Sequence, residues 1–223
     1  MVKQPCAAPR RDLLLAAAGS LLAPVARAQA RPSIDFEGMP VGAPPPGFTA
    51  GLTGGGPPPR WVVREDASAP AGPRVLAETS RDRTDERYPH AVLDGMVAQD
   101  VAVAVRFRAV EGRVDRAAGL VVRYRDAGHY YVARANALED NVRLYRVVGG
   151  RRIQFAGADA PVPRDTWQRL GLRVEGARFT VSLGGRALFV ATDTTFAEAG
   201  RVGLWTKADS LTHFDAFEVE ALR

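Results

Sequence analysis

Cysteine is almost absent from this chain of 223 residues, which contains only Cys6. A chain with one cysteine forms no internal disulfide and offers no cysteine-based zinc site. Cys6 also precedes the apolar run of residues 13–22, whereas the lipid-bearing cysteine of a lipoprotein would follow such a run. The folded part of the chain therefore depends on its hydrophobic core for stability.

Lysine is nearly as scarce, since the sequence contains only Lys3 and Lys207, and arginine supplies the other basic side chains. The net charge is +5, and it falls to +2 when residues 1–30 are set aside. The arginines are spread along the chain among aspartate and glutamate, whereas nucleic-acid binding requires basic residues clustered on one face. The sequence predicts no nucleic-acid partner.

The apolar run at residues 13–22 is too short to span a membrane. Arg10-Arg11 precede it, and Ala28-Gln29-Ala30 match an A-x-A cleavage site. The arginine pair with the following Asp-Leu-Leu resembles a bacterial twin-arginine export signal, and an ordinary secretory signal is the alternative. We expect residues 1–30 to be a cleaved signal peptide and residues 31–223 to be a periplasmic or secreted domain.

Several catalytic motifs are also missing. The chain has no Gly-x-Ser-x-Gly elbow, no Glu-x-Asp-x-x-Glu pair on one strand and no glycine-rich phosphate loop leading into a helix. Its histidines, His90, His129 and His213, do not have the spacing of metal ligands. These absences argue against a classical glycosidase pattern, a nucleotide site and a transition-metal centre.

The sequence does contain strong period-2 alternation from residue 100 onward. Residues 101–107, for example, place Val101, Val103, Val105 and Phe107 on one face, and no helical period appears after the signal. Closely spaced strands with turn signals predict an all-β fold built as a two-sheet antiparallel sandwich. We expect a short first strand at residues 34–37 and loops at residues 38–59, which are rich in Gly and Pro, and 78–89, which are highly charged.

Several of these segments resemble a known fold family, and the clearest is the motif Gly-x-Val-Gly-Leu-Trp at residues 200–205. The others lie at residues 105–110, 119–125, 129–137, 166–170 and 178–183. Together they resemble the concanavalin A-like jelly roll of laminin G-like and bacterial 3-keto-disaccharide hydrolase-like domains. The resemblance implies a carbohydrate ligand and hydrolysis of a modified (3-keto) disaccharide or another glycoside, but it supplies no catalytic residue.

The best candidate site is a predicted hairpin whose turn lies at residues 137–140. In that register Asn136 faces Asn141, and Arg134 faces Arg143. Two arginines directly opposite each other repel and destabilise the sheet unless an acidic side chain or a bound ligand pairs with their charges. The predicted ligand-binding residues are Tyr130, Arg134, Asn136, Asn141, Arg143, Tyr145, Lys207 and Asp209. The alternatives are a solvated face with surface ion pairs and, at residues 207–209, an ordinary polar turn.

If the protein is an enzyme, we expect Glu139 or Asp140 to act as the general acid or base. The competing hypothesis is a non-enzymatic module of the cell envelope that binds glycan or protein.

No organic cofactor is expected. Asp35, Glu37 and Asp215 are candidate ligands for a structural Ca²⁺, because jelly rolls commonly pair their terminal strands. The sequence carries no signal for an oligomeric state.

Overall fold

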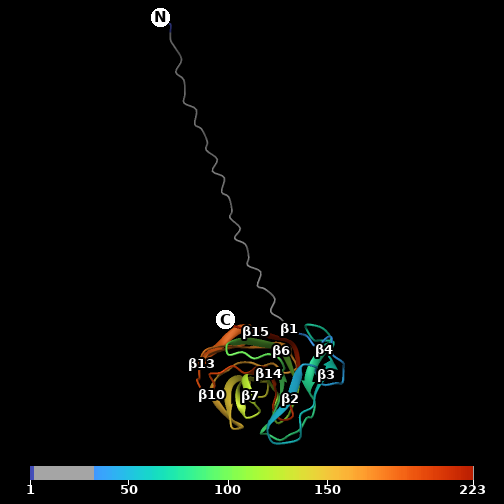
Figure 1. Ribbon diagram of the computed structural model, residues 1–223. Helices are drawn as coiled ribbons and strands as arrows, with labels where there is room; N and C mark the ends of the chain where they lie inside the picture. The colour runs from blue at the N-terminus through green and yellow to red at the C-terminus, as the bar shows by residue number, and fades with distance from the viewer. Residues whose placement is uncertain (3–32, 223) are drawn as a thin grey trace. The chain divides into compact units, whose positions relative to one another are not determined.

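The computed structural model describes residues 1, 2 and 33–222, and all regular secondary structure within them is β-strand (Figure 1). The predicted signal peptide lies outside the described residues except for its first two. No helix in the described part of the chain is long and apolar enough to cross a membrane.

The strands form two antiparallel sheets. Sheet A follows the order β13 (Arg186–Thr192), β12 (Arg178–Leu183), β11 (Gln168–Glu175), β6 (Val101–Glu111), β15 (Leu211–Ala221), β4 (Arg74–Glu78) and β3 (Trp61–Glu65), with β1 (Ser33–Ile34) beside β15. Sheet B follows the order β10 (Arg151–Asp159), β9 (Asn141–Val148), β8 (His129–Asn136), β7 (Ala117–Asp126), β14 (Arg201–Trp205), β5 (Arg87–Leu93) and β2 (Phe48–Gly54). This arrangement confirms the predicted all-β, two-sheet antiparallel sandwich.

The main core lies between the two sheets. The alternation predicted for β6 holds, because Val101, Val103, Val105 and Phe107 are all buried in this core. They pack with inward-facing residues of the opposite sheet, such as Leu120 on β7. Burial of each large apolar side chain stabilises the fold by about 1.5–3 kcal/mol.

A second cluster covers the other face of sheet B. It consists of Tyr88, Val92, Ala117, Val121, Tyr124, Tyr130, Val132, Tyr145, Val147 and Trp205. The hydroxyl groups of Thr53 on β2 and Tyr130 on β8 are 2.9 Å apart. Three strands separate β2 from β8, which in a flat sheet would place them about 19 Å apart. Sheet B is therefore strongly curved, and we call this side its concave face.

Two strands differ from the sequence prediction. Residues 48–54 and 87–93 form β2 and β5, although both ranges fell wholly or partly in predicted loops. Glycine is needed in β2, because a Cβ at Gly51 would lie 2.2 Å from the His90 ring. In β5, Pro89 faces Thr206, one residue beyond the end of β14, and its carbonyl accepts the N–H of Thr206. The missing N–H of Pro89 therefore removes a hydrogen bond only at the end of this strand pairing. The first strand is also shorter than predicted and ends at Ile34.

Candidate functional site

The hairpin of β8 and β9 has the predicted register. Asn136 pairs with Asn141, Arg134 with Arg143, and Val132 with Tyr145. Alternation along each strand directs these side chains to the concave face. The intervening residues, including Ala133 and Leu144, lie in the main core as expected.

Arg134 is the centre of a buried polar network. Its side chain is 3% exposed, and its Nη2 donates to Glu139 Oε2 at 2.7 Å and to Asn141 Oδ1 at 2.8 Å. Its strand partner Arg143 forms a separate ion pair with Asp159 at 2.7 Å. The two facing arginines are thus paired with different carboxylates, Glu139 and Asp159.

Asp115 joins Arg134 to Lys207. Its Oδ1 accepts a hydrogen bond from Asn136 Nδ2 at 3.0 Å, and its Oδ2 lies 3.0 Å from Lys207 Nζ and 3.9 Å from Arg134 Nη1. Lys207 also donates to Asp85 at 2.5 Å. The sequence analysis missed Asp115 because it lies in the loop between β6 and β7, where no strand periodicity indicates direction.

The carboxylates of this network have pKa values shifted in opposite directions. Burial raises the pKa of Asp115, although Arg134 and Lys207 oppose that shift. Burial would also raise the pKa of Glu139, but hydrogen bonds from Asn141 and Arg134 lower it. Opposite shifts of neighbouring carboxyl groups are typical of paired acids and bases.

Three aromatic rings surround the guanidinium group of Arg152 on β10. Its Cζ atom lies 4.5 Å from the ring centroid of Tyr145, 4.7 Å from that of Tyr88 and 5.8 Å from that of Trp205. Such cation–π contacts hold the group over the rings. Its Nη1 is buried without a hydrogen-bond partner among the described residues. Arg152 was not predicted, although its pairing with Val147 places it on the concave face.

Tyr130 lies beneath this cage. It is fully buried, and its hydroxyl oxygen lies 3.4 Å from Trp205 Nε1 and near Thr53. Burial raises its pKa to about 12. Tyr130 therefore supports the floor of the concave face.

His90 is buried on the same face, where its ring nitrogens lie 3.2 Å from Tyr88 O and 3.1 Å from the Tyr124 hydroxyl. Burial lowers the pKa of His90 to about 4.

Asp209 and Asp140 lie outside the network. The carboxylate of Asp209 accepts backbone N–H groups of residues 113, 114 and 115 at 3.0–3.2 Å, which fixes the loop that carries Asp115. Asp140 occupies the hairpin turn with a φ of 48° and accepts the N–H of Val162 at 2.9 Å. Their roles in ligand binding and catalysis stay predictions.

The predicted calcium ligands lie where the first and last strands meet: Asp35 and Glu37 follow β1, and Asp215 lies on β15, which pairs with β1. Asp215 Oδ2 accepts the N–H of Ala71 at 2.8 Å, and Glu37 Oε1 accepts that of Arg74 at 2.7 Å. Burial raises the pKa of Asp215, and the negative charges of Asp35 and Glu37 raise it further. Within residues 33–222, no three or more His, Cys, Asp and Glu side chains are grouped to hold a metal ion, and calcium stays a prediction.

No protein-family model matches the chain, and no curated protein matches its sequence. Among solved structures, the carbohydrate-binding module CBM66 from Bacillus subtilis is 20% identical with a TM-score of 0.62, covering 78% of this chain and 96% of that one. A Bacillus subtilis protein of unknown function with a galectin-like fold is 13% identical with a TM-score of 0.52, covering 77% and 88%.

The exoplasmic/lumenal domain of VIP36, in its Ca²⁺/Man3GlcNAc-bound form, is 14% identical with a TM-score of 0.52, covering 73% of this chain and 84% of that one. These similarities agree with the two antiparallel sheets. The chain has the concanavalin A-like jelly-roll fold.

Proposed function

We propose that this protein is an exported carbohydrate-binding protein whose ligand lies on the concave face of sheet B. The observation that carries this proposal is the buried Nη1 of Arg152, a charged donor without a partner beside three aromatic rings. A buried polar group in a native protein is nearly always hydrogen-bonded. A ligand oxygen or a bound water would satisfy this one.

The chemistry around Arg152 suits a sugar. Tyr88 and Tyr145 are only 5% and 6% exposed, so their rings hold the guanidinium group of Arg152 in place, and a sugar would contact that group. Glu139 and Arg143 stand at the rim with side chains 50% and 24% exposed, where they can bond hydroxyl groups. Two of the similar structures also point to carbohydrate: CBM66 is a carbohydrate-binding module, and the VIP36 domain was solved with Man3GlcNAc bound.

Hydrolysis of a 3-keto disaccharide or another glycoside is the second candidate function. Glycoside cleavage uses one carboxyl group as the acid and another as the base or nucleophile. The raised pKa of Asp115 and the lowered pKa of Glu139, both beside Arg134, favour this reading. Glu139 is the exposed member and would contact the substrate. A non-enzymatic glycan-binding module is the alternative.

Proton NMR of the full chain with a panel of neutral oligosaccharides and 3-keto disaccharides tests both functions. Binding predicts selective line broadening of one sugar, and hydrolysis predicts new anomeric signals over hours. We expect Arg152→Gln to weaken binding at least tenfold. Glu139→Gln should keep binding and abolish any turnover.

Arg173→Gln is the matched control, because Arg173 lies on β11 of sheet A in an exposed ion pair with Glu175. Binding that is unchanged in Arg152→Gln would refute the site. If no sugar of the panel shows line broadening or new signals, carbohydrate binding is refuted and the assignment shifts to a protein partner.

A further inference from the structure

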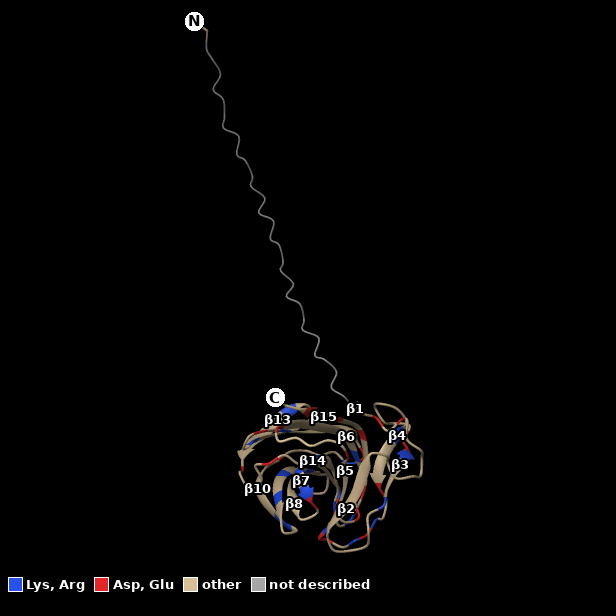
Figure 2. Ribbon diagram, viewed as in Figure 1, with Lys and Arg blue, Asp and Glu red and all other residues tan. Residues whose placement is uncertain are grey.

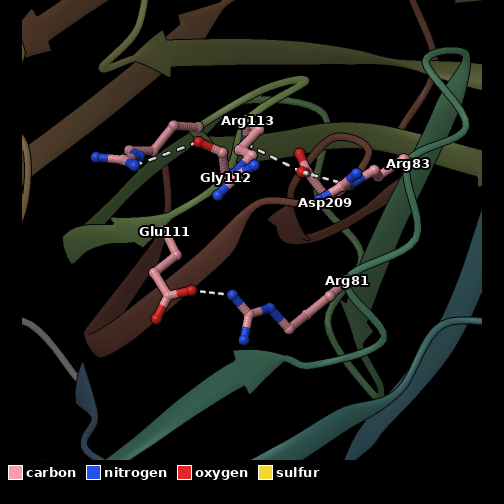
Figure 3. A pocket seen from close by; sticks show the side chains of 7 residues that line it. Arg81, Arg83, Glu111, Gly112, Arg113 and Asp209 are labelled. Atoms are coloured by element: carbon pink, nitrogen blue, oxygen red, sulfur yellow. Dashed lines mark hydrogen bonds and ion pairs between the residues drawn. The ribbon is translucent and has the colours of Figure 1, made fainter.

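A cavity of about 370 Å³ lies beside the loop of residues 112–116. Three segments that are distant in sequence line it (Figure 3): the connection from β4 to β5, the end of β6 with the following loop, and the turn before β15. The lining residues are Arg81, Arg83, Glu111, Gly112, Arg113, Arg116 and Asp209. We call this cavity the arginine pocket.

The acidic residues of the pocket are already engaged. Glu111 forms an ion pair with Arg81, and the two side chains point toward one another in Figure 3. Asp209 accepts three backbone N–H groups and lies 3.9 Å from Arg83 Nε. Four arginines therefore face two carboxylates, and the lining carries a net charge of +2.

Two of the arginines retain donors for a ligand. The side chain of Arg113 is exposed and makes no hydrogen bond or ion pair with any described residue. Arg116 Nη2 donates only to the carbonyl of Gly112, at 3.2 Å, and its Nε is buried without a partner in the described part of the chain. Neither side chain has an acidic partner.

We propose that the arginine pocket binds a tetrahedral oxyanion, sulfate or phosphate, free or as an ester on a sugar. Arginine presents its donors in a planar fork that matches such oxygens with paired, charge-assisted hydrogen bonds. A doubly charged oxyanion would balance the net charge of the lining. It would also supply acceptors for Arg113 and for the buried Nε of Arg116.

The pocket and the concave face share one loop. Asp209 holds residues 113–115 from the pocket side, and Asp115 reaches the Arg134 network from the same loop. An esterified sugar could therefore occupy both places, and this extension rests on the proposed function. The pocket itself does not depend on it.

The first test is a titration of the full chain with sodium sulfate or sodium phosphate, with sodium chloride at equal ionic strength as the reference. Backbone amide NMR shifts at residues 111–116 should saturate with each oxyanion and not with chloride. Arg113→Gln should weaken binding about tenfold or more and leave the fold intact, because its side chain makes no hydrogen bond or ion pair with any described residue. Arg173→Gln on sheet A should bind as the wild type does.

Shifts that do not saturate, or that are equal in the wild type and Arg113→Gln, would overturn the proposal. The source of the oxyanion follows from comparing a sulfated or phosphorylated disaccharide with inorganic sulfate, inorganic phosphate and the unmodified disaccharide. An ester that binds more tightly than the inorganic ion, with the gain lost in Arg152→Gln, identifies a charged glycan. Equal affinities identify a free anion. The unmodified disaccharide reports on the concave face alone, so failures of the two proposals are distinguishable.

Discussion

The 112–116 loop separates two groups of basic side chains, one at the concave face and one in the arginine pocket, which differ in how their charges are paired. On the concave side, Arg134 and Lys207 are buried, and each touches at least two oxygen-bearing partners. On the pocket side, Arg113 and Arg116 have no acidic partner among the residues that the structure describes. A charge removed from water must be paired, whereas a charge at a solvent-filled cavity need not be. The first arrangement stabilises a conformation, and the second is available to a ligand.

Arg134→Met should have the largest effect on stability. Of the cationic partners of Asp115 in the described part of the chain, it would leave Lys207 alone. Breaking a buried ion pair costs about 3–5 kcal/mol of unfolding free energy. Urea denaturation followed by tryptophan fluorescence measures this loss. The same substitution at Arg113 should change the free energy by less than about 0.5 kcal/mol. If Arg134→Met and Arg113→Met lost equal unfolding free energy, the concave face and the arginine pocket would not differ in how charge stabilises the fold.

Asp209→Ala should destabilise both sides together. It would leave the N–H groups of residues 113–115 without their acceptor, at a cost of about 2–3 kcal/mol, since one unsatisfied buried group costs about 1–3 kcal/mol. Asp209→Asn keeps one acceptor oxygen and should cost less. Hydrogen exchange at residues 113–115 should accelerate in both variants, and protection that persists in Asp209→Ala would contradict this account.

Acid should weaken the concave face before it affects the pocket. The unfolded chain protonates His90 near pH 6.5, but folded His90 accepts a proton only near pH 4 because it is buried. Its contribution to stability is therefore complete above pH 6.5 and is lost as the pH falls toward 4. The loss has a slope of up to about 1.4 kcal/mol per pH unit. The slope measured in urea between pH 7 and 5 should decrease in His90→Gln.

The pocket provides the comparison for this pH dependence. Its arginines remain charged throughout the same range, so sulfate affinity should stay constant between pH 5 and 7. A sulfate affinity that fell in parallel with stability would show that the two sides are coupled.

Glu139→Gln should have the smallest effect on stability among these changes. The side chain is 50% exposed, and the amide retains an oxygen that can accept from Arg134. A partly exposed ion pair contributes about 0–1 kcal/mol. Urea denaturation should place the variant within that range of the wild type. A loss as large as that of Arg134→Met would show that Glu139, rather than Asp115, is the main partner of the buried arginine.

Much of the fold could be predicted because local alternation determines it. The hairpin register followed from period-2 spacing and one turn position, and it correctly placed Arg134 opposite Arg143 and Asn136 opposite Asn141. The start of strand β5 was missed because residues 78–89 are highly charged, which locally indicates a loop, whereas β5 forms by pairing with β14 and β2.

The rest of the site depends on contacts between distant segments. Tyr88 reaches Trp205 and Arg152 only because β5 pairs with β14 and sheet B curves. Asp115 reaches Lys207 through a loop that Asp209 holds in place. Strand periodicity carries no information about either contact, so the sequence predicted the hairpin half of the site and not the half contributed by β5, β10 and the loop.

The last two strands occupy central positions: β14 lies between β7 and β5 of sheet B, and β15 between β6 and β4 of sheet A. Figure 2 labels these six strands. In each sheet, both neighbours of the central strand are synthesised before it: β5 and β7 precede β14, and β4 and β6 precede β15. Neither sheet is continuous without residues 201–221, so a chain cut before residue 201 would leave each sheet divided into two separate groups of strands.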